Sequence, residues 1–250
     1  MGIFSGLLLS YQPVSNLETL LEFYKFETVK KVFINGSSTD IILNGFIKLD
    51  PMGRIKLKSG KEIDKCLIFQ EFLLDVRSIE YVEEEKTQVR IKGRQEKHVK
   101  EGFFFISRGS FIFLISTGEK RILIDAISNA LYRISDHIRN VTINLESLEA
   151  SFPRLWHATI RRRDQNSILG ININSGYYFG EDITSDSEQG EIISSKRKRS
   201  IGFDARIDNK LRKVKINGNG MLQFPGLDIT HIISILNFID IVVLPFTSPV

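Results

Sequence analysis

The sequence predicts an α+β protein made of two β-rich lobes of antiparallel sheet, each with helices packed on one face. Apolar and polar residues alternate over most of the chain, and tight-turn dipeptides such as Asn35-Gly36 separate the alternating runs. Helix-period stripes are confined to 15–24, 127–138 and 229–239. Strands that end in a helix occur twice, so we place the lobes at residues 1–145 and 146–250.

The N-terminal lobe is predicted to begin with a helix and to continue as a meander. Ser15 followed by Glu18 is a capping-box pattern, and 17–24 carries one apolar face. From Thr28 the period is two, and the runs "TVKKVFI", "DIILNGFIKL", "GRIKLKS" and "EIDKCLIF" are separated by turn dipeptides. The segment 102–124, "GFFFISRGSFIFLISTGEKRILI", is apolar on both faces and predicts central strands, followed by the helix stripe at 127–138.

The C-terminal lobe is predicted to contain further strands and a closing helix. Its strand candidates are "RLWHATIRRR", "SILGINI", "GYYFGEDI", "RSIGFDARI", "RKVKIN" and "GMLQF". The segment from Asp182 to Ser195 has no apolar periodicity, and the five acidic residues of 181–191 precede a basic run, so we expect a mobile loop there.

Composition predicts a soluble, cytoplasmic protein. Hydrophobic residues make up 42% of the chain and charged residues 26%, as in globular proteins. The one cysteine, Cys66, excludes an intramolecular disulfide and fits a reducing compartment. The longest apolar tract, "DITHIISILNFIDIVVLPF", carries Asp228, His231 and Asp240, which favours a buried helix over membrane insertion.

Signatures of catalysis are missing from the sequence, so we expect no enzyme activity, no cofactor and no metal. No Walker A, Gly-x-Gly-x-x-Gly or Gly-x-Ser-x-Gly motif occurs, and the four histidines lack zinc-ligand spacing. One acidic pattern keeps an alternative open. Asp75, Glu84 and Lys86 in "DVRSIEYVEEEK" resemble the core of restriction-endonuclease-like nucleases, which implies two carboxylates on a divalent metal and a lysine that stabilises developing charge.

Cationic clusters are the main functional signal. Net charge is +4, and basic residues gather in several short segments. Lysines and arginines that converge on one groove bind phosphates and release counterions. The predicted nucleic-acid-binding residues are Arg161, Arg162, Arg163, Lys196, Arg197, Lys198, Arg199, Arg206, Arg212, Lys213 and Lys215.

Two expectations refine this prediction. Arg212 and Lys213 are adjacent on one strand and should face opposite ways, whereas Arg206 and Arg212 flank the Asp208-Asn209 turn and are expected to line one surface. Aromatic side chains near the cations, namely Trp156, Tyr177 and Tyr178, are candidates for stacking on bases.

Two resemblances extend this interpretation. The stretch 206–239, a hairpin with an Asn217-Gly218 turn followed by a helix, resembles the half-repeat of TATA-binding-protein-like folds, which implies a curved sheet with helices on one face and nucleic acid on the other. A small, basic chain with two β-rich lobes and no catalytic motif is similar in plan to the PAZ-analogue (N- and linker-like) partners of short prokaryotic Argonautes. That similarity implies a short Argonaute, a guide RNA and a DNA target as partners.

The favoured hypothesis is therefore a non-catalytic, nucleic-acid-binding accessory subunit of a larger complex, possessing affinity for RNA, DNA or both. One alternative is the metal-dependent nuclease described above. A second is a purely structural interaction module, with a phenylalanine-rich hairpin as its interface: Phe103, Phe104, Phe105, Phe111 and Phe113.

Overall fold

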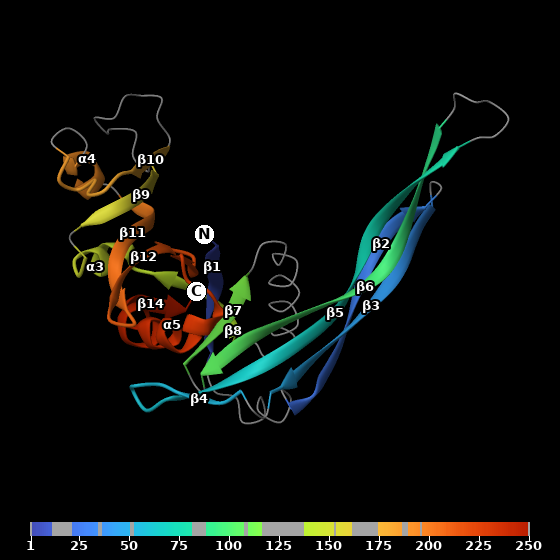
Figure 1. Cartoon of the computed structure of the whole chain (residues 1–250), viewed down its shortest axis with the longest axis horizontal. Coiled ribbons are helices and arrows are strands. Elements are labelled where there is room, and N and C mark those ends of the chain that lie inside the picture. The colour runs from blue at the N-terminus through green and yellow to red at the C-terminus, as the bar shows by residue number, and fades with distance from the viewer. Residues whose placement is uncertain are drawn as a thin grey trace.

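The computed structural model shows a protein built mostly from antiparallel strands (Figure 1). It describes residues 2–11, 22–34, 37–50, 53–81, 89–107, 110–116, 138–152, 154–161, 175–186, 190–195 and 197–249. The strands are β1 (Ile3–Tyr11), β2 (Tyr24–Ile34), β3 (Ser37–Leu49), β4 (Ile55–Lys56), β5 (Glu62–Tyr81), β6 (Val89–Ser107), β7 (Phe111–Ser116), β8 (Ile138–Ile143), β9 (Leu155–Arg161), β10 (Ser175–Phe179), β11 (Lys198–Ile207), β12 (Lys210–Asn217), β13 (Met221–Pro225) and β14 (Thr247–Pro249).

Helices in the described residues are short. They are α3 (Leu145–Glu149), α4 (Gly190–Ser195), η2 (Ile229–His231), α5 (Ile232–Phe238), the π-helical η3 (Ile239–Val243) and η4 (Leu244–Phe246). The predicted closing helix is thus confirmed as the run from η2 to η4. The helix predicted at 15–24 falls largely outside the described residues, and Tyr24 already begins β2. The helix predicted at 127–138 also lies outside them, except for Ile138, which begins β8.

The strands join one continuous antiparallel sheet in the order β10-β9-β11-β12-β13-β1-β7-β6-β5-β3-β2. β1 lies between β13 and β7, so a strand from residues 1–145 completes the sheet of residues 146–250. The antiparallel, β-rich part of the predicted fold class is confirmed. The finer prediction, an α+β fold of two lobes each with its own helices, does not describe this sheet. The boundary at 145/146 stays a prediction.

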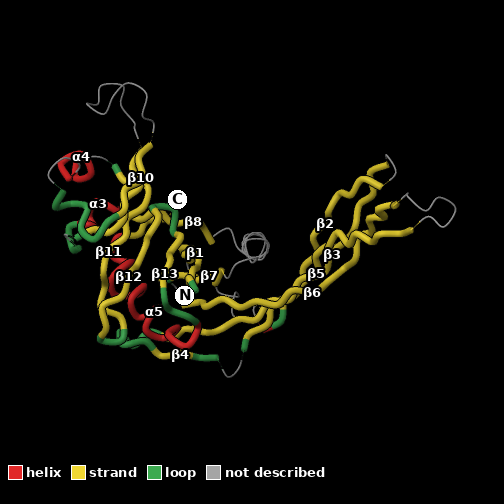
Figure 2. Tube along the Cα trace, turned by 45° about the horizontal axis from the view of Figure 1, so that its top comes forward, coloured by secondary structure: helices red, strands yellow, loops and turns green. Residues whose placement is uncertain are grey.

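Four of the strands form a long arm. β5 and β6 pair along their whole length, from Ile63 opposite Ser107 to Tyr81 opposite Val89. β2 pairs with β3, as the predicted meander requires. β3 then pairs directly with β5, so the meander prediction is wrong for 53–59, where only the two-residue β4 forms and pairs with β5. The arm projects from the body that the remaining strands and α5 form, and Figure 2 shows the same separation after rotation.

The main hydrophobic core lies in the body, between the sheet and the C-terminal helical run. Ile235, Leu236, Ile239 and Val243 are buried there. The stretch from Ile229 to Phe246 has the length and apolar character of a membrane span, and 39% of it is buried inside the protein. Ile233 and Ile241 remain exposed.

The segment predicted to be a mobile loop contributes to the same core. Ile183 and Ile193 are buried, and the residues from Gly190 to Ser195 form α4. The Thr184 hydroxyl donates to the Asp182 carboxylate at 2.7 Å, which closes a turn. The loop prediction is therefore wrong for 190–195, which form a helix, whereas 182–186 do form a loop, with Ile183 packed in the core. Residues 187–189 lie outside the described residues. The two buried isoleucines, Ile183 and Ile193, are ten residues apart, which is too far to show a period in the sequence.

Candidate nucleic-acid interface

The β11–β12 hairpin fixes which cations share a surface. Asp208 and Asn209 have φ of 54° and 58°, the left-handed conformation that a two-residue type I′ turn needs. The resulting register places Arg206 opposite Leu211 and Ala205 opposite Arg212. Side chains of directly opposed residues point to the same face of a sheet. Arg206 and Arg212 therefore lie on opposite faces, and the prediction that they line one surface is wrong.

Arg212 and Lys213 diverge as predicted. Arg212 shares the face of the buried Val214, and its Nε atom is buried without a hydrogen-bond partner among the described residues. Lys213 lies on the outer face, with its Nζ atom 5.0 Å from the centre of the Trp156 ring. Of these two cations, Lys213 is the one available to a ligand on the outer face.

A β-bulge brings Trp156 to the same outer face. β11 pairs with β9 through Gly202 opposite His157 and then Phe203 opposite Leu155, so Trp156 is the extra residue. The Trp156 Nε1–H donates to the carbonyl of Phe203 at 3.0 Å. The indole occupies the space over Gly202, because a Cβ atom added there would meet the ring at 2.8 Å. A glycine is thus required beneath this tryptophan.

β10 adds two more rings to this surface. Phe179 pairs with His157 and Tyr177 with Thr159, which places both aromatic side chains on the outer face. The Phe179 ring meets Trp156 edge-on at 5.8 Å, and the Tyr177 ring meets His157 at 4.6 Å. We define the aromatic–cationic face as Trp156, His157, Tyr177, Phe179, Lys213 and Lys215.

Exposure separates the stacking candidates. Tyr177 is 67% and Phe179 68% exposed, whereas Trp156 is only 7% exposed. Tyr178 points the other way and packs against the core. Of the three rings predicted to stack on bases, only Tyr177 is exposed. Phe179 is equally exposed but was not among the predicted rings. The alternation of side chains in "GYYFG" gives the missing signal, since residues two apart share a face.

Neither Lys213 nor Lys215 forms an ion pair with a described residue. The Lys215 Nζ atom lies 5.6 Å from the centre of the Tyr177 ring. Burial lowers the pKa of Lys215, so an anion brought close to it would stabilise the charged form. Arg206 extends this surface toward the hairpin turn, and the exposed Asp204 lies opposite Lys213 as the acidic member of the same face.

His157 supports the face without contributing charge. Its side chain is fully buried, and its Nε2 atom lies 3.0 Å from the Ser200 hydroxyl. Burial, with a smaller effect from the positive charge of Lys215, lowers the pKa of His157 to about 4. The imidazole is therefore neutral at pH 7 and acts as a packing platform for Tyr177.

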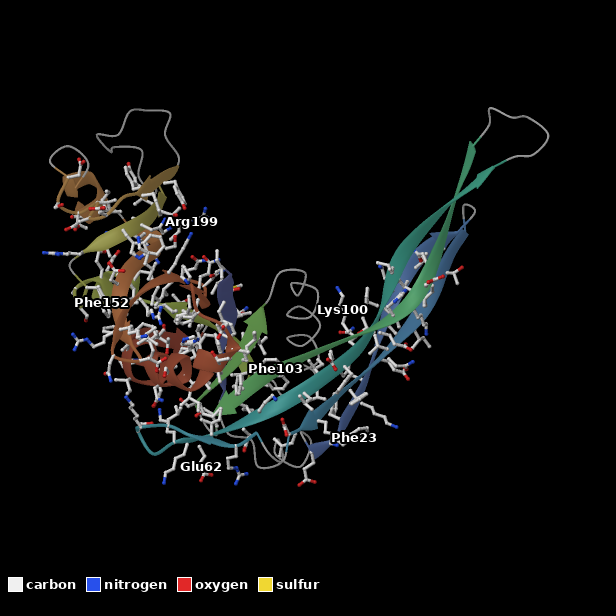
Figure 3. The ribbon with its side chains drawn as sticks, viewed as in Figure 1. Phe23, Glu62, Lys100, Phe103, Phe152 and Arg199 are labelled. Carbon is white, nitrogen blue, oxygen red and sulfur yellow. The ribbon has the colours of Figure 1, made fainter. Side chains whose placement is uncertain are left out.

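The predicted cluster at 196–199 is divided by a second bulge, between Lys198 and Ser200. Lys198 points inward, where its Nζ atom forms a 2.7 Å ion pair with Glu149, and its side chain is 1% exposed. Arg197 and Arg199 are exposed and line an open pocket of about 940 Å³. Arg199 is labelled in Figure 3. Lys196 lies outside the described residues.

The remaining predicted site residues are placed only in part. Arg161 ends β9 opposite Ser175, while Arg162 and Arg163 lie outside the described residues. Asp75 belongs to β5, and Glu84 and Lys86 also lie outside. Within the described part of the chain, no group of three His, Cys, Asp or Glu side chains has the geometry of a metal site.

The phenylalanine-rich hairpin forms part of the core. Four of its rings, Phe104, Phe105, Phe111 and Phe113, are buried, and Phe103 packs edge-on against Phe105 at 5.8 Å. These four rings are not exposed for a partner, and Phe103 is half-buried.

No protein-family model, curated protein or solved structure matches the chain.

Proposed function

We propose that the protein binds single-stranded nucleic acid on the aromatic–cationic face and does not cleave it. The observation that carries this proposal is the exposure of Tyr177 and Phe179 next to Lys213 and Lys215. Proteins that bind single strands combine aromatic rings, on which bases stack, with cations that follow the phosphates. Both are present here on neighbouring strands of one sheet.

The spacing of the two exposed rings favours a single strand over a duplex. Residues two apart on a strand are separated by about 6.8 Å, which is twice the roughly 3.4 Å between stacked nucleotides. Each ring thus suits one base of a strand whose bases have been pulled apart. Such bases are accessible in single strands and not inside a duplex.

Stacking on this face is tested by removing each exposed ring. Tyr177→Ala and Phe179→Ala should each weaken binding of a dT or rU oligonucleotide about tenfold, because stacking contributes roughly 1–3 kcal/mol per base. Leu211→Ala is the matched control, since Leu211 lies on the same face and is 69% exposed. Fluorescence anisotropy with labelled oligonucleotides measures all three. An equal, small effect of the three substitutions would contradict the proposal.

We propose further that the protein acts as an accessory subunit of a larger complex. The support is that the described residues form a candidate binding face and include no group of three His, Cys, Asp or Glu side chains with the geometry of a metal site. The similarity in plan to partners of short prokaryotic Argonautes makes a guide RNA and a DNA target the expected ligands. Purification from the native host, with sequencing of bound nucleic acid and identification of bound proteins, tests this. The nuclease alternative predicts Mg²⁺-dependent cleavage of the same oligonucleotides.

A further inference from the structure

The pocket that Arg197 and Arg199 line is continuous with the aromatic–cationic face. Lys215 belongs to both, and Thr159 and Ser200 on the neighbouring strands also line the pocket. The opposite wall comes from residues 142–146, together with Ser248 of β14. Hydrogen bonds hold the walls together, because the Ile143 N–H donates to the Gly218 carbonyl at 2.8 Å and the Gly218 N–H donates to the Arg199 carbonyl at 2.9 Å.

The charge of this pocket suits a doubly charged anion. Lys198 is satisfied by Glu149, which leaves Arg197, Arg199 and Lys215 as the cations and Glu146 as the carboxylate among the described lining residues. A phosphate monoester carries nearly two negative charges and three acceptor oxygens, whereas a phosphodiester inside a strand carries one charge. Arginine binds phosphate oxygens in pairs with its planar fork of N–H donors.

The size and polarity of the pocket suit a whole nucleotide. Its volume of about 940 Å³ lies at the upper end of the range for small-ligand sites. Beyond the cations, amide and hydroxyl groups of Asn144, Asn217, Thr142 and Ser248 line it. These groups supply donors and acceptors for a sugar and a base edge.

We propose that this pocket binds the terminal nucleotide of a strand held on the aromatic–cationic face, with a terminal phosphate monoester between Arg197 and Arg199. This inference rests on the proposed function, because the neighbouring face must hold the rest of the strand. A free nucleoside monophosphate carries the same phosphate monoester, but it lacks the rest of the strand that would stack on Tyr177 and Phe179.

The test compares oligonucleotides of one sequence with a 5′-phosphate, a 3′-phosphate or hydroxyls at both ends. One of the two phosphorylated forms should bind about tenfold more tightly than the hydroxyl form. The Arg197→Gln/Arg199→Gln double variant should lose that preference while still binding the hydroxyl form. Arg206→Gln, on the same sheet face but outside the pocket, should weaken all three ligands alike and keep the preference. Thermal melting of each variant verifies folding.

The outcomes separate this inference from the proposed function. Binding of all three oligonucleotides with equal affinity would overturn the terminal-phosphate site and leave the stacking face intact. Failure of every oligonucleotide to bind would overturn both. A nucleoside monophosphate that binds as tightly as the phosphorylated oligonucleotide would overturn the assignment to a strand end.

Discussion

Replacing Lys213 and Lys215 together by glutamine is expected to weaken binding of a single-stranded oligonucleotide roughly a hundredfold. Each lysine lies over an aromatic ring of the proposed binding face, at 5.0 Å from Trp156 and 5.6 Å from Tyr177. A charged hydrogen bond to phosphate contributes about 1.5 kcal/mol, so two of them account for about 3 kcal/mol and the stated factor. Glutamine preserves much of the side-chain length and removes the charge.

The salt dependence of this variant provides a second readout. The slope of log affinity against log salt should become shallower by about 1.4, since each phosphate contact on a single strand contributes about 0.7. Arg212→Gln is the matched control, because Arg212 is adjacent to Lys213 in sequence but lies on the other face. An unchanged slope in the double variant, or an equal loss in Arg212→Gln, would contradict the placement of phosphates on this face.

Lys198→Met is expected to lower the free energy of unfolding by about 3 kcal/mol, while Arg197→Met changes it by less than about 0.5 kcal/mol. Both residues belong to one basic run, yet only Lys198 is buried, in its 2.7 Å ion pair with Glu149. Removing one partner of a buried ion pair leaves the other charge without compensation. For a chain of this length, the loss corresponds to a melting temperature lower by roughly 6–12 °C.

A double substitution distinguishes the ion pair from other roles of Lys198. Lys198→Met combined with Glu149→Leu should recover most of the lost stability, because no uncompensated charge remains. Thermal melting of the two single variants and the double variant measures the coupling. Equal melting temperatures for Lys198→Met and Arg197→Met would contradict a buried ion pair. The same result bears on any experiment that neutralises 196–199 together, since a loss of binding would include a loss of folding.

The hairpin and the C-terminal helical run were predictable because their signals are local. The Asp208-Asn209 turn residues tolerate positive φ, and the apolar spacing at 229–239 repeats with the helical period. The face of the sheet on which each cation lies was predictable only in part. Alternation correctly separated Arg212 from Lys213, but the facing of Arg206 depends on the register that the turn length sets.

The two bulges explain why the rest of the site was not predictable. Alternation assumes that no residue is added within a strand, and the bulges at Trp156 and between Lys198 and Ser200 break this assumption. Because of these bulges, Trp156 and His157 lie on one face of the sheet and the Lys198 side chain points inward. The insertion of β1 between β13 and β7 was equally hidden, because strand order in an open sheet depends on contacts between distant segments.

The central claim, that single-stranded nucleic acid binds on the aromatic–cationic face, is tested most directly by the fluorescence of Trp156. It is the one tryptophan of the chain, and it lies within this face beneath Phe179 and Lys213. An oligonucleotide titration can be followed both by Trp156 emission and by the anisotropy of the labelled strand. The emission should change saturably, with the same midpoint as the change in anisotropy. That midpoint should rise as salt increases. Binding seen by anisotropy with no change of Trp156 emission would show that the strand lies elsewhere.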